Sequence, residues 1–247
     1  MHHNPLGVAF FALYWVVFVY SIVLHEVAHG YSSFLMGDPT AHREGRLTLN
    51  PLKHIDFFFS IVMPIAFFVS MGMPFGGAKP CPVNPYLYRN LRWGSLISAA
   101  AGPLTNLALA LFFAGLFIVF KAQAGGRISP TTQLLAMCLV LNLFLAIFNL
   151  IPVPPLDGSH VLASLLPRSL QEGWGKVQAL GWMPVLAVVI LDQFAPKCVP
   201  APSDLPPMSP LNAIVFWPAY LILRLLGVGD NTWLSLINPW NLMSVGG

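Results

Sequence analysis

Two histidines and a glutamate interrupt an apolar segment near the start of the chain, in the sequence SIVLHEVAHG (residues 21–30). On a helix, His25 and His29 lie on the same face, one turn apart, because they are four residues apart. Such a pair can bind one Zn²⁺ through two imidazole nitrogens. Glu26 is then placed to take the proton of a zinc-activated water as it attacks a carbonyl group. The spacing therefore predicts the chemistry of a zinc-dependent hydrolase.

The surroundings of this motif strengthen that interpretation. Residues 6–24 carry no charged side chain, and residues 31–36 continue as sequence that is compatible with a helix. Inside a membrane-spanning helix each ionisable group costs roughly 2.5–3.5 kcal/mol, so such groups need an interior partner or a function. The alternative, a polar patch where the helix leaves the membrane, is less well supported because helix-compatible sequence continues beyond the motif.

A zinc site of this kind needs a third protein ligand. The HExxHxxGxxH continuation is absent, since Ser32 and Leu35 stand where glycine and histidine would be. Asp157 is the best-placed candidate, because it lies in NLIPVPPLDGSH (residues 149–160), which follows an apolar helix and is broken by prolines. Non-helical backbone at membrane depth is tolerated where it lines a cavity inside the protein, although an ordinary helix-ending loop at the surface is the alternative. The other candidate ligands are histidines, namely His42, His54 and His160.

The composition places the chain in a membrane. Charged residues make up 9% of the chain, against about a quarter in soluble domains, and the mean hydropathy is +0.71. Lipid can solvate such a surface, whereas water cannot. The first residues lack the basic region and cleavage site of a signal peptide, which favours a retained helix. The net charge of +3 carries no nucleic-acid signature, and the three widely spaced cysteines form no CxxC pattern that would indicate a disulfide framework or a thiolate zinc site.

Apolar stretches of membrane-spanning length alternate with polar or proline-rich breaks along the chain. They predict an all-α polytopic membrane protein with about five transmembrane helices in a single domain over residues 1–247. A helix stop at Gly-Asp-Pro (37–39) and a helix start at Ser-Pro (129–130) mark two of the breaks. The apolar stretches are 6–36, 57–75, 94–120 and 131–151, followed by weaker ones at 176–195 and 211–227.

The HExxH motif in one transmembrane helix and the sequence N-x-x-P-x-x-P-L-D-G at the end of a later one occur together. In this combination the chain resembles the site-2 protease family of intramembrane zinc metalloproteases, and within it the small prokaryotic members without a PDZ or CBS domain. The likeness covers residues 10–166 and includes Gly-Pro-Leu-Thr-Asn at 102–106. It implies a three-helix catalytic core within residues 6–166, to which the two weaker apolar stretches add C-terminal helices.

The resemblance also implies roles for individual residues. One Zn²⁺ would be bound by His25, His29 and Asp157 together with a water molecule. Glu26 would be the catalytic base, and Asn149 would face the carbonyl group of the substrate. The implied activity is that of an endopeptidase that cuts membrane protein substrates within or near their transmembrane segments, as in regulated intramembrane proteolysis. The expected partners are therefore transmembrane proteins and the lipid bilayer.

The metal ligands constrain how residues 57–75 are placed. The HExxH motif lies late in the first helix and Asp157 follows the helix at 131–151, so these two helices must run in the same direction to bring the ligands to one depth. If 57–75 and 94–120 both crossed the membrane, the first helix and the helix at 131–151 would run in opposite directions. We therefore expect 57–75 to enter and leave on the same side, as a re-entrant segment.

The distribution of basic residues supports the same topology through the positive-inside rule. With a re-entrant 57–75, nine of the twelve Lys and Arg residues fall on the side of residues 37–54, whereas a crossing 57–75 divides them six against six. That side is then cytoplasmic, which predicts a multi-pass protein of a prokaryotic cell membrane with its active site nearer the cytoplasmic face. The nine are Arg43, Arg46, Lys53, Lys79, Arg89, Arg92, Arg168, Lys176 and Arg224, and the other three are Lys121, Arg127 and Lys197.

The loop at residues 76–85 (GGAKPCPVNP) is the predicted place of substrate recognition. A transmembrane substrate must unwind before hydrolysis, because its peptide bonds are shielded by its own hydrogen bonds. Proline favours extended backbone, so the loop could form a short membrane-embedded strand on which the opened substrate pairs, as the resemblance implies. A mere linker is the alternative. The candidate substrate-binding residues are Gly77, Lys79, Pro80, Pro82 and Asn84.

Small and polar residues in two of the apolar stretches have a simpler expected role. Asn142 shares a helix face with Asn149 and is expected to hydrogen-bond a neighbouring helix. Close helix packing is the expected role of a group within 94–120, namely Ala99, Ala100, Gly102 and Asn106.

Two other functions fit some of these features. A divalent-metal transporter would bind zinc in passage, but it needs a polar path, and the stretch 94–120 offers few polar side chains. An inactive homologue that only binds transmembrane segments would not need Glu26, which is intact. The sequence names neither the substrate nor the oligomeric state.

Overall fold

The structure is a computed structural model, and it describes residues 5–56, 78–197, 199 and 208–228. Among these residues the only strand-type pairing is an isolated antiparallel bridge between Val199 and Met208, so the predicted all-α fold is confirmed. The α-helices are α1 (Pro5–Met36), α2 (Thr40–Arg43), α4 (Leu91–Gln123), α5 (Pro130–Leu150), α6 (Asp157–Leu165), α7 (Arg168–Gln178), α8 (Met183–Phe194) and α9 (Pro210–Leu225), and two 3₁₀ turns are η1 (Pro51–Lys53) and η3 (Pro85–Leu87).

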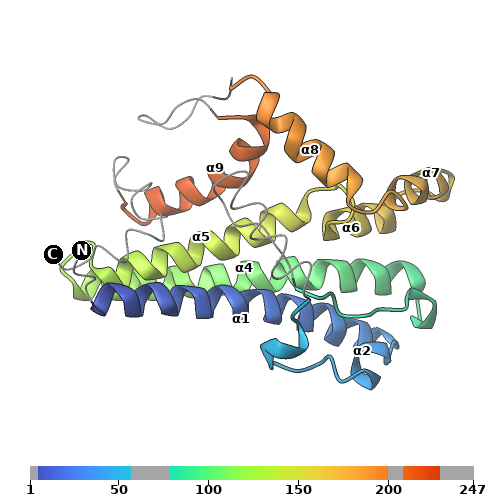
Figure 1. Ribbon diagram of the computed structural model, residues 1–247, viewed down its shortest axis with the longest axis horizontal. Helices are drawn as coiled ribbons and strands as arrows, with labels where there is room; N and C mark the ends of the chain where they lie inside the picture. Colours follow the sequence, from blue (N-terminus) through green and yellow to red (C-terminus); the bar gives the residue numbers. More distant parts are fainter. Residues whose placement is uncertain (1–4, 57–77, 198, 200–207, 229–247) are drawn as a thin grey trace.

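α1, α4 and α5 lie side by side and form the centre of the molecule, with α4 packed against both of the others (Figure 1). Each of the three is long and apolar enough to span a membrane. Their 32, 33 and 21 residues correspond to about 48, 50 and 32 Å of helix, against about 30 Å for the hydrocarbon core of a bilayer. The three-helix core expected from the resemblance corresponds to this bundle.

The boundaries of two core helices follow from local sequence. α1 ends at Met36, and Gly37 adopts a φ of 115°, which suits glycine and stops the helix. α5 begins with a capping box in which Ser129 and Thr132 satisfy each other's backbone amides, and Pro130 occupies the first helical position. The helix stop at 37–39 and the helix start at 129–130 are therefore confirmed.

The expected re-entrant segment 57–75 lies outside the described residues, but the chain on either side of it is described. The amide of Arg89 donates to the carbonyl oxygen of Met36 at 3.0 Å, and the amide of Lys79 donates to that of His54 at 2.8 Å. The start of α4 is thus bound to the end of α1. α1 and α5 consequently run in the same direction, as the predicted metal ligands require.

The weaker apolar stretches fold differently from the expectation. Residues 176–195 are not one helix, because α7 ends at Gln178, Gly181 adopts a φ of 59°, and α8 begins after a bend of 76°. α8 and α9 contain 12 and 16 residues, or about 18 and 24 Å of helix, which is less than the hydrocarbon core. The described residues thus provide three spanning helices, or four if α7 and α8 form one broken span, where about five were expected.

The end of α9 lies beside the end of α4, a placement that the sequence did not predict. Lys121 Nζ donates to the carbonyl oxygens of Leu226 and Gly227, both at 2.7 Å, and apolar side chains of α4, α5 and α9 pack into one cluster. Arg224 therefore lies at the same end as Lys121, whereas the topology from the sequence put it at the opposite end. Removing Arg224 from the nine leaves eight of the twelve basic residues on the side of 37–54.

Candidate metal centre and active site

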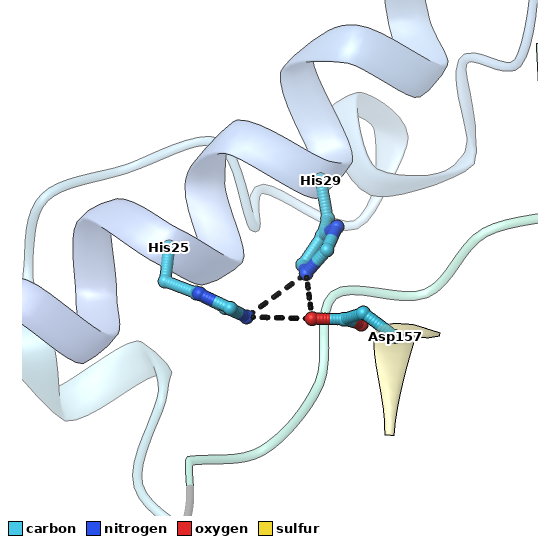
Figure 2. A group of neighbouring side chains, drawn as sticks. All are labelled: His25, His29 and Asp157. Atoms are coloured by element: carbon cyan, nitrogen blue, oxygen red, sulfur yellow. Dashed lines mark hydrogen bonds and ion pairs between the residues drawn. The ribbon is translucent and has the colours of Figure 1, made fainter. Parts of the chain in front are cut away.

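Three side chains from two helices converge inside the molecule. His25 and His29 project from one face of α1 towards Asp157, the first residue of α6 (Figure 2). The Nε2 atoms of the two histidines are 3.0 Å apart, and Asp157 Oδ2 lies 3.1 Å from His25 Nε2 and 3.3 Å from His29 Nε2. Within the described part of the chain this is the only group of three His, Cys, Asp or Glu residues close enough to share a metal ion.

Asp157 reaches this position because α6 packs tightly against α5. A Cβ atom on Gly158 would lie 2.2 Å from the carbonyl oxygen of Leu150, so only glycine permits this approach. At the other end of α6, Arg92 of α4 donates to the carbonyl oxygens of Ser164 and Leu165, at 2.9 and 3.2 Å. The proline-rich sequence before Asp157 therefore ends in a helix whose two termini are both tied to the core bundle.

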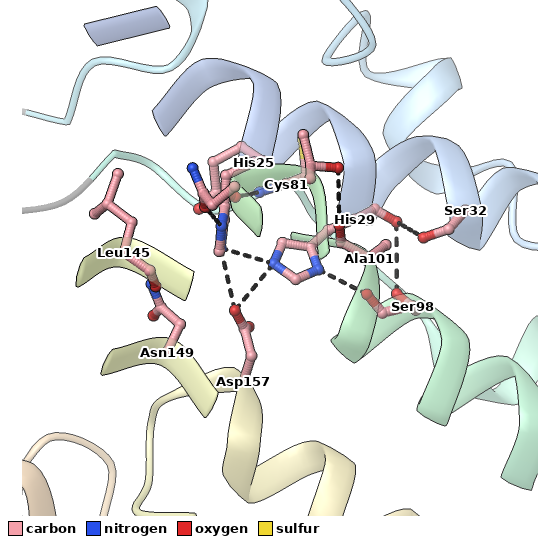
Figure 3. A network of polar contacts seen from close by, with 12 residues as sticks. His25, His29, Ser32, Cys81, Ser98, Ala101, Leu145, Asn149 and Asp157 are labelled. Atoms are coloured by element: carbon pink, nitrogen blue, oxygen red, sulfur yellow. Dashed lines mark hydrogen bonds and ion pairs between the residues drawn. The ribbon is translucent and has the colours of Figure 1, made fainter. Parts of the chain in front are cut away.

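Hydrogen bonds define which nitrogen of each histidine faces Asp157. His29 Nδ1 lies 2.7 Å from the carbonyl oxygen of Ser98, which can only accept, so Nδ1 carries the proton (Figure 3). His25 Nδ1 lies 2.5 Å from Asn106 Oδ1, an amide oxygen that can only accept. His25 therefore also carries its proton on Nδ1. Both Nε2 atoms of the neutral rings then present lone pairs. Asp157 Oδ2 is buried and receives no hydrogen bond, so three acceptor atoms face one another, an arrangement that a cation stabilises.

These residues fit a single Zn²⁺. Ligand atoms at 2.0–2.2 Å from a tetrahedral zinc ion are about 3.3 Å from one another, close to the three distances of the site. The space in front of them is kept open by Gly102 of α4. A Cβ atom there would lie 2.3 Å from His29 Nε2 and 2.6 Å from His25 Nε2.

The three other candidate ligands have different contacts. His42 stacks on Phe34, with ring centroids 5.1 Å apart, and His54 Nε2 lies 2.9 Å from the carbonyl oxygen of Thr48. His160 is on α6, where its Nδ1 lies 3.3 Å from Gln178 Nε2. None of these histidines joins the group of His25, His29 and Asp157.

Glu26 lies beside the ligands, where a cavity of about 1100 Å³ reaches the site. One of its carboxylate oxygens, Oε2, accepts a hydrogen bond of 2.9 Å from the backbone amide of Cys81. The cavity is lined by Glu26, His29 and Asp157 and continues between the residues that precede α4 and helices α6 and α7. Glu26 therefore borders the space that a substrate and water would occupy.

Residues 78–84 cross this region as irregular chain, so the strand expected at 76–85 is absent from its described part. Side chains hold this backbone in place of strand pairing. Arg46 Nη2 donates to the carbonyl oxygens of Lys79 and Pro80, at 2.7 and 3.3 Å, and the amide of Asn84 donates to Asp38 Oδ2 at 2.6 Å. The groups of this segment with such partners are the carbonyl oxygens of Lys79 and Pro80 and the amide of Asn84, whereas the amide of Lys79 pairs with the backbone at His54.

The carboxylate of Asp38 is adapted to this anchoring role. Burial raises its pKa, but hydrogen bonds from the amide of Asn84 and from Thr40 outweigh burial and hold the pKa below its usual range. Asp38 therefore remains charged at neutral pH and keeps its hold on the segment.

The candidate substrate-binding residues fall into different positions. Gly77 lies outside the described residues. Pro80 lines the cavity, together with its neighbours Cys81 and Val83, whereas Pro82 does not. Lys79 is exposed, and the side chain of Asn84 caps η3 by accepting from the amide of Tyr86.

Asn149 lies in the last turn of α5, near Asp157 (Figure 3). Its Nδ2 donates to the carbonyl oxygen of Leu145 at 2.9 Å. An amide nitrogen has two hydrogens, so one remains for a further acceptor such as a substrate carbonyl.

Three contributors to the site were not predicted from the sequence. Close helix packing was predicted for Gly102 and Asn106, yet Gly102 leaves space beside the Nε2 atoms of His25 and His29, and Asn106 contacts His25. The available signal in the sequence was an asparagine, Asn106, that lies in an apolar helix one turn after Gly102. The carbonyl oxygen of Ser98 has no signal in the sequence, because every residue has one.

Comparisons with known proteins identify the class. A sequence profile described as "Peptidase family M50" matches residues 123–191. The "Putative zinc metalloprotease YwhC" of Bacillus subtilis is 32% identical over 209 residues, which cover 82% of this chain and 83% of that protein. The "Putative zinc metalloprotease Rip2" of Mycolicibacterium smegmatis is 31% identical over 189 residues, covering 76% and 70%. No solved structure gives a significant match.

The fold and the site define a multi-pass helical membrane protein in which two histidines and one aspartate lie close enough to hold a metal ion. The chain belongs to peptidase family M50, the family of the site-2 proteases. It is a zinc metalloprotease, and these relatives do not support the divalent-metal transporter that was considered from the sequence.

Proposed function

We propose that this protein is an intramembrane endopeptidase that hydrolyses peptide bonds within or next to the transmembrane segments of other membrane proteins. The observation that carries the proposal is the position of the metal centre. His25 and His29 belong to the candidate span Gly7–Met36, and the helix continues for seven residues, or about 10 Å, beyond His29. A peptide bond that reaches these ligands must enter the membrane region.

The residues around the site divide the chemistry among them. His25, His29 and Asp157 would hold the zinc ion, which when bound acidifies a coordinated water and polarises the scissile carbonyl. Glu26 accepts the proton of the attacking water and later delivers it to the leaving amine. The amide of Cys81 fixes Glu26 Oε2, so that Oε1 is the oxygen available for this proton. Asn149 donates its second amide hydrogen to the substrate carbonyl.

Substrate and water reach these groups through the cavity. Pro80, Cys81 and Val83 form one of its walls, and polar side chains of α4, α6 and α7 form others. An extended peptide, rather than a helix, exposes the backbone groups that could bind along the segment 78–84. The substrate is therefore a transmembrane segment that has unwound near the end of its span.

The cytoplasmic face of a prokaryotic cell membrane is the proposed side of the site. Eight of the twelve basic residues belong to the end of the molecule that holds 37–54, which is the end nearer the metal ligands. The positive-inside rule orients this end towards the cytoplasm.

The position of the cut tests this proposal. The purified protein is incubated in detergent with a tagged single-span protein, and the products are mapped by mass spectrometry. We expect cleavage inside the span or within a few residues of its cytoplasmic end, and no cleavage of a soluble protein that carries an unrelated polar sequence of the same length. Efficient cleavage of the soluble sequence alone would contradict the assignment.

A further inference from the structure

We propose that two buried asparagines, Asn106 of α4 and Asn142 of α5, are positioning residues that hold His25 in the tautomer able to bind zinc. The inference rests on the proposed role of His25 as a ligand. It adds a function to the roles expected from the sequence, which were close helix packing for Asn106 and a hydrogen bond to a neighbouring helix for Asn142. Both side chains are completely buried.

The hydrogen-bond relay consists of the carbonyl oxygen of Cys138, the side chains of Asn142 and Asn106, and His25. It has a defined direction because the carbonyl oxygen at its start can only accept. Asn142 Nδ2 donates to the carbonyl oxygen of Cys138 at 2.9 Å, which leaves Asn142 Oδ1 facing α4. Asn106 Nδ2 donates to that oxygen at 3.0 Å and to the carbonyl oxygen of Ser21 at 3.4 Å. The remaining group of Asn106, its Oδ1, then faces His25.

This direction determines the protonation of the histidine. His25 Nδ1 lies 2.5 Å from Asn106 Oδ1, so Nδ1 carries the hydrogen and Nε2 keeps a lone pair towards Asp157 and His29. If the amide of Asn106 were flipped, its NH₂ group would face Nδ1. The ring would then prefer its proton on Nε2, where it blocks metal binding.

His25 and His29 differ in the groups that orient their rings. His29 is oriented by the backbone carbonyl of Ser98, which no side-chain substitution removes. His25 is oriented by the side chain of Asn106, which is oriented in turn by Asn142 and by the carbonyl oxygen of Ser21. The relay therefore links the packing of α1, α4 and α5 to the affinity of the site for zinc.

Substitution of the far asparagine tests the relay, because Asn142 does not contact His25. In Asn142→Leu the nearer of the two acceptors that orient Asn106 is lost, and only the longer bond to the carbonyl oxygen of Ser21 remains. Asn106→Leu removes the acceptor for His25 itself. We expect both variants to bind zinc about ten- to a hundredfold more weakly than wild type in competition with a chelator. Thr105→Val, on the same helix, removes a hydroxyl that donates to the carbonyl oxygen of Ala101 in its own helix, and should bind zinc as wild type does.

A rescue experiment separates orientation from packing. A carboxylate accepts through either oxygen, so Asp at position 106 needs no orienting partner. In Asn106→Asp one carboxylate oxygen faces the acceptors Asn142 Oδ1 and Ser21 O, so we expect a zinc affinity somewhat below that of wild type. The double variant Asn106→Asp/Asn142→Leu lacks the first of these acceptors and should bind zinc at least as well as Asn106→Asp alone. This comparison remains informative if Asn142→Leu by itself does not fold. A double variant as weak as Asn142→Leu, or as Asn106→Leu, would overturn the proposal.

The tautomer itself can be observed. ¹⁵N-histidine NMR of the zinc-free protein, with the His25 signal assigned by its loss in His25→Asn, should show Nδ1–H in wild type and a shift towards Nε2–H in Asn142→Leu. Weak zinc binding with an unchanged tautomer would mean that the asparagines only pack the helices. If His25→Asn itself keeps zinc, the metal site is wrongly assigned, whereas loss of zinc in His25→Asn but not in Asn106→Leu contradicts the relay alone.

Discussion

At the scale of single residues, the site depends on two glycines, which have no side chain, as much as on the ligands. Gly102 faces the metal ligands with no side chain, and Gly158 lets α6 approach the end of α5. Both glycines sit where a methyl group would displace a ligand or the helix that carries one. Their role is steric, and it can be tested without touching a metal ligand.

Gly102→Ala should abolish zinc binding, because the new Cβ would lie 2.3 Å from His29 Nε2 and 2.6 Å from His25 Nε2. The matched control is Gly115→Ala, on the same helix, where a Cβ would meet no atom within 4 Å. Zinc-to-protein ratios of the two purified variants should therefore be near zero and near that of wild type. Equal ratios would show that the metal does not occupy the space beside Gly102.

The choice of the third ligand gives a second prediction. Asp157→Ala should lower the zinc content to about that of His25→Ala, because each removes one of three ligand atoms. His160→Ala should keep the metal, since His160 contacts Gln178 and lies outside the group of three. Zinc measured on the purified variants decides between Asp157 and His160 as the third ligand. Loss of zinc in His160→Ala but not in Asp157→Ala would identify His160 as that ligand.

These residues also show what a sequence can reveal about a site. His25, Glu26 and His29 could be identified because helical spacing places them together, and Asp157 because proline and glycine surround it. Asn106 could not, because its role depends on a partner on another helix, Asn142, and on the direction of an amide. A backbone acceptor such as the carbonyl of Ser98, which binds His29 Nδ1, leaves no trace in the residue types.

At the scale of elements, the segment 78–84 is held by side chains from three places. Arg46 binds its carbonyl oxygens, Asp38 binds the amide of Asn84, and Glu26 binds the amide of Cys81. The sequence predicted an extended segment here from its prolines, but strand pairing could not be foreseen or excluded without these contacts. The arrangement couples the position of Glu26 to that of the cavity wall.

Arg46→Met should therefore reduce kcat/KM about tenfold or more while the zinc content stays that of wild type. Arg46 makes two charge-assisted bonds to Lys79 and Pro80, and such bonds contribute about 1.5–3 kcal/mol each. Lys53→Met, which removes an exposed basic residue nearby, is the control and should retain activity. Loss of zinc in Arg46→Met would show instead that the segment supports the metal ligands.

At the scale of the whole molecule, the arrangement of the helices determines which helix ends lie on the same side of the membrane. Hydropathy identified the three core helices correctly, because each is long and apolar. It could not place α8 and α9, since both are shorter than a span and their positions depend on contacts such as that of Lys121 with the end of α9. A hydrogen bond between a side chain and the end of a distant helix has no hydropathy signal.

Cysteine labelling tests this topology, in a background where Cys81, Cys138 and Cys198 are serine. Cysteines that replace Asn50 and Asn84 should react with an impermeant reagent from the same, cytoplasmic, side. Cysteines that replace Gly126 and Arg224 should react from the opposite side, because Arg224 lies near the end of α4. Labelling of position 84 from the outside alone would contradict the shared end of α1 and α4, and labelling of position 224 from the cytoplasm would contradict the placement of α9.

Whether Glu26 moves the proton in a zinc-dependent cleavage is tested most directly by Glu26→Gln. Glutamine keeps the size of the side chain and can still accept the hydrogen bond from Cys81, but it cannot take a proton from water. The prediction is a variant with the zinc content of wild type and no detectable cleavage of a membrane-protein substrate in detergent. Substantial turnover by this variant would contradict the role of Glu26, and a saturable zinc flux in vesicles that persists without any cleavage by wild type would contradict the peptidase itself.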